Sequence, residues 1–318
     1  MDLLLTLFLL LCFATCTWFL LVVLKPNPGP RKSANLPPGP NPLPVIGNIL
    51  DLGEKPHQSL AKLSKIYGPL MRLKLGTTTT VVVSSPEIAR IVLQQYDQVF
   101  SSRTHADAIR ALDHHKHSVG WIPADNQWRK IRKLCKEKMF SGQRLDGSQG
   151  LRREKLRNLR DYVNECCVNG QAVDIGGAAF TTSLNVMSAT LFSVDFAALA
   201  SDSSEELNDV MSGIGSIIGR PNVADCFPLL RLVDPQGIRR QTTFYFNKCF
   251  GIFDEIIRQR LQTNDSAATK FDVLEELLEI NQNDESELSF DDMKHLFLVS
   301  IVCITELIVV GCELYVLY

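Results

Sequence analysis

Residues 1–40 read MDLLLTLFLLLCFATCTWFLLVVLKPNPGPRKSANLPPGP and divide into an apolar run, a basic stretch and a proline-rich string. The apolar run from Leu3 to Leu24 is 22 residues long and carries no charge. As a helix it would extend ~33 Å, which is enough to cross a bilayer. A cleaved signal peptide is the alternative, but its apolar core is usually only ~7–15 residues and follows basic residues. We therefore predict a transmembrane anchor over residues 1–24.

The charges that follow the anchor predict its orientation. Lys25, Arg31 and Lys32 come directly after it, and no acid occurs between Leu3 and Leu50. Because loops rich in Lys and Arg stay in the cytosol, we expect the rest of the chain on that side, beyond a single N-terminal span.

The string Leu36-Pro37-Pro38-Gly39-Pro40 cannot continue a helix, since proline fixes φ and lacks an N–H donor. Residues 25–50 are therefore predicted to be a basic, proline-rich hinge. A ligand for a proline-reading domain is the other interpretation.

Composition favours a folded protein. The net charge is -2 and 45% of residues are hydrophobic, which argues against a disordered chain or one that coats nucleic acid. The charge is unevenly distributed: residues 128–160 hold twelve Lys and Arg against three acids, whereas residues 272–292 hold nine acids and no base. An anionic partner is expected to dock on the first of these segments, unless it is simply a solvated surface.

The nine cysteines form no paired CxxC units, so we interpret them as reduced thiols. Zinc sites need close ligand pairs, and His114, His115 and His117 come nearest to that pattern. We favour a polar loop for this histidine cluster and predict no metal site from it.

Local patterns predict a mainly α fold with a small β-sheet. Ser59 to Tyr67 is helical in pattern, and Leu70–Leu75 and Thr77–Ser84 are two β-rich runs about Gly76. Ser85-Pro86-Glu87 is typical of a helix start. Later segments repeat apolar residues at helical spacing, and a polar loop is predicted at Gln143–Gly150. These apolar residues form two stripes, one of Leu156, Leu159, Val163 and Cys166 and the other of Phe246, Phe250, Phe253 and Ile257.

Five strings carry a resemblance to a known family. They are Leu36-Pro37-Pro38-Gly39-Pro40, Phe100-Ser101-Ser102-Arg103, Trp128-Arg129-Lys130-Ile131-Arg132, Phe227-Pro228-Leu229-Leu230 and Asp234-Pro235-Gln236-Gly237. With the anchor and hinge before them, they resemble the microsomal cytochrome P450 monooxygenases, and Phe227–Arg240 resembles the plant clade of geraniol 8-hydroxylase and ferruginol synthase. The resemblance implies that residues 51–298 are the N-terminal portion of a P450 catalytic domain, preceded by the transmembrane helix and hinge.

The resemblance also implies an activity. Family members lie in the endoplasmic reticulum membrane, bind haem, and insert oxygen into a hydrophobic substrate, here expected to be a terpenoid. Their electrons come from NADPH through a reductase. Trp128 and Arg132 match the family's WxxxR pair, which contacts a haem propionate; residues four apart share a helix face, and both side chains donate hydrogen bonds. Ile109–Trp121 and Ile217–Val223 correspond to segments that line the substrate. The competing interpretation of WxxxR is an aromatic core residue beside a solvated basic stripe.

None of the nine cysteines lies in a match to the family's haem-thiolate signature, FxxGxRxCxG. Residues 291–298 match the start of the family's long central helix, but Val299–Tyr318 departs from it, without the Ala-Gly-x-Asp/Glu-Thr motif that relatives carry there. We interpret the divergent apolar tail 299–318 as translated intron, with a second membrane span as the rival idea. The expectation is a truncated, inactive chain with no catalytic residues of its own.

Two non-catalytic functions remain as alternatives. The chain could be a membrane protein that binds the reductase or full-length relatives through its basic segment. It could also be a membrane-tethered scaffold for anionic lipid.

Overall fold

The computed structural model describes residues 36–196, 203–262, 272–283 and 288–302, with residues 10–11, 13–15 and 17–18 nearer the N-terminus. The chain divides into two units, Met1–Phe100 with Val223–Val233 and Ser101–Asn222 with Asp234–Tyr318. Most of the predicted anchor, and the predicted tail from residue 303 onward, lie outside the described residues. Among the residues described, no helix is both long and apolar enough to cross a membrane.

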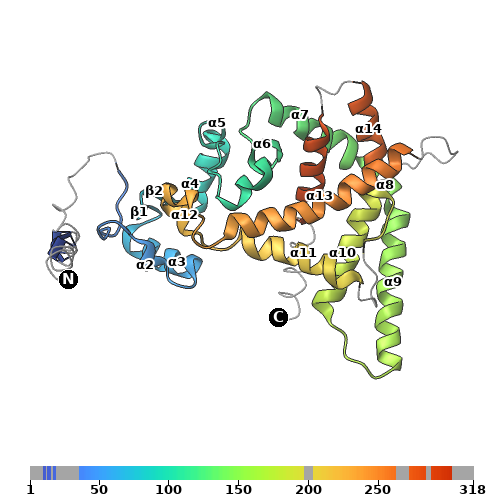
Figure 1. Cartoon of the computed structure of the whole chain (residues 1–318), viewed down its shortest axis with the longest axis horizontal. Helices are drawn as coiled ribbons and strands as arrows, with labels where there is room; N and C mark the ends of the chain where they lie inside the picture. Colours follow the sequence, from blue (N-terminus) through green and yellow to red (C-terminus); the bar gives the residue numbers. More distant parts are fainter. Residues whose placement is uncertain are drawn as a thin grey trace, which may run out of the picture. The chain divides into compact units, whose positions relative to one another are not determined.

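A β-hairpin forms the centre of the first unit. β1 (Leu70–Leu75) pairs antiparallel with β2 (Thr78–Val83), in a register from Leu70 opposite Val83 to Leu75 opposite Thr78 (Figure 1). Gly76 closes the hairpin with φ +60°, and a Cβ there would lie 2.6 Å from the carbonyl oxygen of Cys226. A residue other than glycine would be both strained and blocked at this position. The predicted pair of β-rich runs is confirmed.

The proline-rich string packs against β1. The backbone N–H of Arg72 donates to the carbonyl of Pro38 at 2.8 Å, and a Cβ on Gly39 would lie only 1.9 Å from the carbonyl oxygen of Arg72. Asn48 also bonds Lys74, donating to its carbonyl at 2.6 Å and accepting from its N–H at 2.9 Å. The glycine of this string is therefore needed for close approach of two backbone segments.

Short helices complete the first unit. The predicted helix start at Ser85 is confirmed, because its hydroxyl accepts from the N–H of Ile88 at 3.2 Å. The predicted helix ending at Tyr67 is also confirmed, although it begins earlier, at Pro56. The elements are α2 (Ile49–Leu52), α3 (Pro56–Tyr67), α4 (Pro86–Arg90), η1 (Ile91–Gln95), α5 (Asp97–Phe100), α12 (Val223–Cys226) and η4 (Pro228–Leu232).

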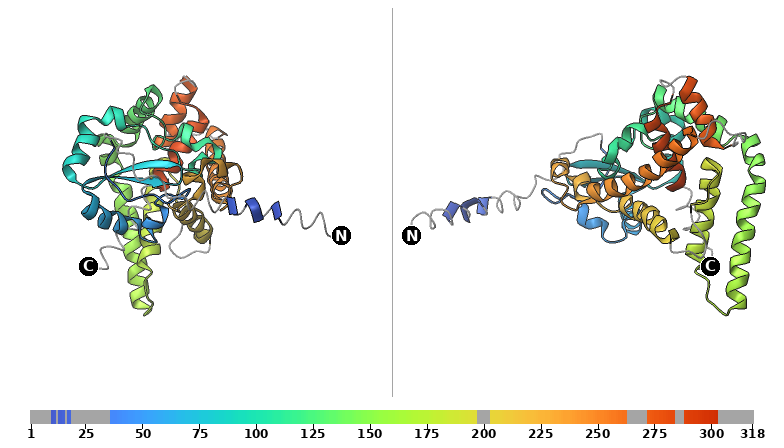
Figure 2. Two further views of the ribbon diagram at one scale, coloured as in Figure 1. Left: turned by 90° about the vertical axis from the view of Figure 1, so that its left-hand side faces the viewer. Right: turned by 45° about the vertical axis from the view of Figure 1, so that its right-hand side comes forward.

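In the part of the second unit that the structure describes, the regular elements are all helices. α9 (Gln149–Val168) and α10 (Ile175–Phe192) pack against each other, and α11 (Ser203–Ile218) packs against α13 (Ile238–Gln262) (Figure 2). The other elements are η2 (Ala108–Asp113), α6 (His114–His117), α7 (Asn126–Leu134), η3 (Cys135–Met139), α8 (Gly142–Gly147), α14 (Val273–Asn283) and a helix over residues 290–302.

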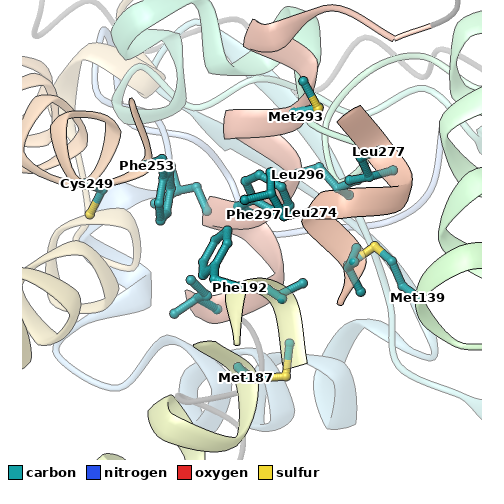
Figure 3. Close-up of a cluster of buried hydrophobic side chains, with 14 of the residues drawn as sticks. Met139, Met187, Phe192, Cys249, Phe253, Leu274, Leu277, Met293, Leu296 and Phe297 are labelled. Carbon is teal, nitrogen blue, oxygen red and sulfur yellow. The ribbon is translucent and has the colours of Figure 1, made fainter. Parts of the chain in front are cut away.

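Aromatic side chains from three helices meet in the core of this unit. The ring of Phe297, from helix 290–302, lies edge-on to Phe192 of α10 at 4.8 Å and to Phe253 of α13 at 6.0 Å between centroids (Figure 3). All three side chains are fully buried. Phe246 and Ile257 of the predicted α13 stripe are buried too, which confirms the helical face expected from their spacing.

The polar loop predicted at Gln143–Gly150 is wrong. Residues Gly142–Gly147 form α8, whose N-terminus is capped by the hydroxyl of Ser141, and α9 begins at Gln149. Arg144 forms an ion pair with Glu276 of α14, far away in sequence. This tertiary contact stabilises a helix whose composition resembles that of a loop.

Candidate functional site

α7 carries the two residues of the predicted WxxxR pair. The helix begins after Asp125, whose carboxylate accepts from the N–H of Trp128 at 3.1 Å. Trp128 is half-buried and packs against the core of the second unit. Arg132 follows one turn later and is exposed. The structure therefore places both side chains on one helix, as the spacing predicted, but in different environments.

The indole of Trp128 already has a partner within the chain. Its Nε1–H donates to the carbonyl oxygen of Val119 at 3.1 Å. Three neighbouring backbone carbonyls also accept hydrogen bonds from side chains. Gln127 donates to the carbonyl of Lys116 at 3.3 Å, and His105 donates to that of Trp121 at 3.0 Å. Arg103 donates to the carbonyl of Gly120. Trp128 thus helps to position residues 116–121, a role that sequence reasoning did not find.

Arg132 is the member of the pair that has donors to spare. Among the residues that the structure describes, no hydrogen bond or ion pair to its guanidinium is found. Arg129, Lys130 and Lys133 on the same helix are exposed as well. Because a guanidinium binds a carboxylate through two parallel N–H bonds, Arg132 suits the carboxylate of an incoming group.

In the second unit, the two predicted substrate-lining segments approach each other next to Ala108. The segment Ile109–Trp121 contains most of η2 and all of α6, and Ile109 is fully buried. Ala108 packs with Ile217 and Ile238 in a small apolar cluster, with Tyr245 against it. Residues about 110 positions apart in the chain are therefore buried together in one small part of the core.

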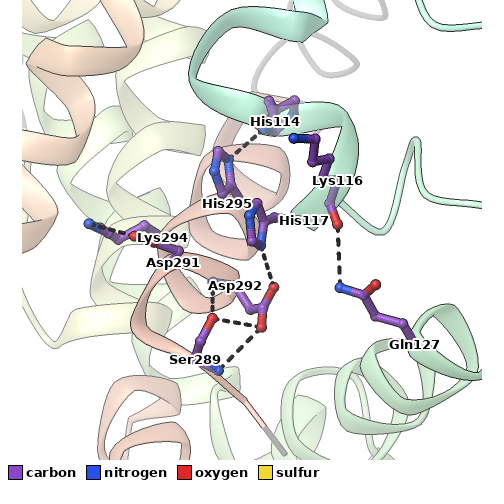
Figure 4. Close-up of polar contacts among 9 residues, drawn as sticks. All are labelled: His114, Lys116, His117, Gln127, Ser289, Asp291, Asp292, Lys294 and His295. Atoms are coloured by element: carbon purple, nitrogen blue, oxygen red, sulfur yellow. Dashed lines mark hydrogen bonds and ion pairs between the residues drawn. The ribbon is translucent and has the colours of Figure 1, made fainter. Parts of the chain in front are cut away.

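The predicted polar loop around His114 is also wrong. His114 is 2% exposed and its Nδ1 lies 2.8 Å from the Nδ1 of His295, while the Nδ1 of His117 lies 2.8 Å from the Oδ1 of Asp292 (Figure 4). The signal missed was the partner, since His295 and Asp292 lie more than 170 residues further along the chain. Within the described ranges, no group of three or more His, Cys, Asp or Glu side chains is arranged to hold a metal ion.

A cavity in the second unit lies away from these segments. It has a volume of about 1130 Å³ and is lined by residues of η3, α8, α9, α10 and α14, among them Met139, Leu151, Met187 and Val273. Arg144, Lys155, Asp195 and Glu276 form ion pairs along it. None of its lining residues belongs to either predicted substrate-lining segment.

The described residues fit haem only in part. Arg132 can contact a propionate, but the described cysteines do not suit the iron. Burial raises the pKa of Cys135 and raises that of Cys249 to about 12, so both remain neutral thiols. Cys166, Cys167 and Cys226 are free thiols outside the family's signature. Among the described residues, Arg132 would therefore hold a propionate of the group, and the cysteines would not hold its iron.

Comparisons with known proteins extend this picture. The cytochrome P450 family model matches residues 37–302. Cytochrome P450 76T24 of Catharanthus roseus is 55% identical over 269 residues, which is 84% of this chain and 54% of the relative. Ferruginol synthase of Isodon rubescens is 47% identical over 270 residues, covering 84% and 55%. Sugiol synthase of Salvia miltiorrhiza is 44% identical over 288 residues, covering 90% and 57%. The chain thus spans somewhat more than half the length of these relatives.

Proposed function

The chain belongs to the cytochrome P450 family, and from this membership we propose that it supplies the N-terminal portion of a plant haem-thiolate monooxygenase that hydroxylates a hydrophobic, terpenoid-type substrate. The observation that carries the proposal is the family match over residues 37–302. The names of the relatives, ferruginol synthase and sugiol synthase, support the substrate class.

The chain's own residues have distinct parts in this function. Arg132 holds a haem propionate through its exposed guanidinium. Trp128 fixes the carbonyl of Val119 and so positions residues 116–121. The buried cluster of Ala108, Ile217 and Ile238 supports the neighbouring segments that are proposed to line the substrate. Haem bound through a cysteine thiolate supplies the oxygen-activating chemistry.

Within its 318 residues, the chain has no cysteine in the haem-thiolate signature. We therefore propose that these residues are inactive by themselves and that activity needs a cysteine from a C-terminal portion. We also propose that residues 1–24 anchor the protein in the endoplasmic reticulum membrane with the body in the cytosol, where the NADPH-dependent reductase supplies electrons. The support is the charge-free run Leu3–Leu24 and the basic residues after it.

A hybrid chain tests the proposal. Residues 1–298 would be joined to the matching C-terminal half of the Isodon rubescens ferruginol synthase and assayed in membranes with reductase and NADPH. The hybrid should bind haem and oxidise a terpenoid substrate of that synthase. The intact synthase is the positive control, and the 318-residue chain alone is the negative control. A hybrid that binds haem normally but oxidises no terpenoid would contradict the proposed substrate class.

A second function is favoured by one observation, the exposed basic face of α7. Arg129, Lys130 and Lys133 present positive charge that fits an acidic protein surface, so the chain alone would bind the reductase without catalysis. Exchange of all three for glutamine should abolish salt-sensitive capture of the reductase. Capture that is unchanged by these substitutions would refute this function.

A further inference from the structure

A pair of histidines joins the segment before α7 to helix 290–302. His114 is the first residue of α6, His295 lies in helix 290–302, and both side chains are almost fully buried. Their Nδ1 atoms are 2.8 Å apart, which is hydrogen-bond distance. His117 lies beside them, stacked on His295 with ring centroids 5.1 Å apart and planes 5° apart (Figure 4).

Aromatic rings from α13 enclose the pair. Phe246 meets His114 edge-on at 5.1 Å, and Phe250 meets His295 edge-on at 4.8 Å. The charged and titratable groups nearby are His105, Arg110, Asp113, His115, Lys116 and His117 from the segment before α7, Asp254 from α13, and Asp291, Asp292 and Lys294 from helix 290–302.

The nearby carboxylates have other cationic or polar partners. Asp292 bonds His117 and the cap residue Ser289, and Asp291 pairs with Lys294 at 3.1 Å. Lys294 also reaches Asp254 at 3.3 Å. Asp113 pairs with Lys116 at 2.9 Å. A proton added to the histidine pair would therefore meet carboxylates whose charge is already largely compensated.

The hydrogen bond between the histidines depends on their protonation. One Nδ1 must carry hydrogen and the other must accept it, so the bond exists when both rings are neutral. A first added proton can reside on an Nε2 and leave the bond intact, but it places a charge among aromatic rings away from water. A second proton removes the acceptor. Each of these protonations costs less free energy when the two rings separate and become hydrated.

Burial and the charges of neighbouring histidines both lower the pKa values of His114 and His295. Burial, and then the charge of His295, lowers the pKa of His114 to about 3, and burial, and then the charge of His117, lowers that of His295 to about 4. The ordinary value is 6.5. Between pH 6.5 and pH 4 the separated form binds protons that the joined form does not, so falling pH favours separation.

We propose that the His114–His295 pair is a pH-sensitive latch that holds residues 108–121 on helix 290–302 at neutral pH and releases them on acidification. The same segment carries Ala108, which packs on Ile217 and Ile238, and the carbonyl of Val119, which Trp128 holds. Release of the latch therefore loosens the packing of this buried cluster and the bond to Val119. The latch requires neither haem nor catalysis, so a test of the latch is independent of a test of the proposed activity.

Amide hydrogen exchange on the 318-residue chain in membranes tests the latch. Protection factors would be measured at pH 7.5 and pH 5.5, after correction for the intrinsic pH dependence of exchange. A histidine that titrates near pH 6.5 only in the separated form changes the opening equilibrium ~10-fold between pH 7.5 and pH 5.5. The protection of residues 108–121 should therefore fall ~100-fold if both histidines titrate, and ~10-fold if one does. α9 is the internal reference and should change much less. No fall in 108–121, or an equal fall in α9, would overturn the proposal.

Variants separate titration from packing. Asparagine places an amide near the Nδ1 position of histidine, so His114→Asn with His295→Asn keeps a donor and an acceptor but cannot take up protons. The double variant should show no pH-dependent loss of protection in residues 108–121. If both histidines titrate, His295→Asn alone should show about the square root of the wild-type change. His57→Asn, at an exposed position of α3, should behave as wild type. A double variant that responds as fully as wild type would exclude the pair as the latch.

Discussion

Replacing Trp128 with phenylalanine should loosen residues 116–121 without unfolding α7. The substitution keeps an aromatic ring against the core but removes the Nε1–H that donates to Val119 at 3.1 Å. A neutral hydrogen bond contributes ~0.5–1.5 kcal/mol net. Val119 is only half-buried, so water can reach its freed carbonyl, and we expect the lower part of this range, about 0.5–1 kcal/mol.

That free energy corresponds to a ~2–5-fold rise in the opening equilibrium of the segment, because RT is about 0.59 kcal/mol at 25 °C. Amide exchange of residues 116–121 in the 318-residue chain would measure it at pH 7.5, where the histidine latch is closed. Exchange in α9 should be unchanged.

Arg132→Gln is the matched control, since Arg132 lies on the same helix and no partner for it is found in the described part of the chain. It should leave exchange of residues 116–121 at the wild-type level. If Trp128→Phe also left it unchanged, the bond to Val119 would not position the segment, and the role that we assign to the indole would be refuted.

Three further predictions follow from the site, the core and the anchor. In the hybrid protein, Arg132→Ala should weaken haem retention by ~1.5–3 kcal/mol, the contribution of a hydrogen bond to a charged group, and unchanged retention in a haem-transfer assay would reduce WxxxR to a packing motif. Phe297→Ala should lower the free energy of unfolding by ~3–5 kcal/mol in urea titrations, because its fully buried ring contacts Phe192 and Phe253; a loss below 1 kcal/mol would contradict this packing. Asn264, in the acceptor triplet Asn264-Asp265-Ser266, should carry no glycan when the protein is made in plant or yeast membranes, and a glycan there would overturn the cytosolic topology.

The sequence predicted the elements whose signals are local. The strands around Gly76 and the start of α4 at Ser85 depend on glycine conformation and on side-chain capping, which act within a few residues. The buried face of α13 follows from the spacing of Phe246, Phe253 and Ile257. These features were therefore accessible without tertiary information.

Features that depend on distant partners were not predicted. Lys155 is buried in α9 while its neighbour Leu156 is 57% exposed, because the ammonium bonds Asp195 at 2.7 Å, 40 residues away. α8 is helical with Arg144 paired to Glu276. A hydropathy pattern assigns Lys to the surface and Leu to the core, and it has no information on which acid a base will meet.

The candidate site shows the same division. The spacing of Trp128 and Arg132 correctly placed both on one helix, but it could not show that the indole already bonds Val119. The histidine pair was missed because His114 and His295 are 181 residues apart, and neither residue alone differs from an ordinary surface histidine in sequence. Contacts between residues so far apart in the sequence can be identified only from the folded structure.

A carbon monoxide difference spectrum tests the central claim most directly. Reduced membranes that contain only the 318-residue chain should show no thiolate-type Soret band, because none of its nine cysteines lies in the haem-thiolate signature. The hybrid with the ferruginol synthase C-terminal half should show that band under the same conditions. A clear thiolate-type band from the 318-residue chain alone, lost on substitution of one of its cysteines, would contradict the account.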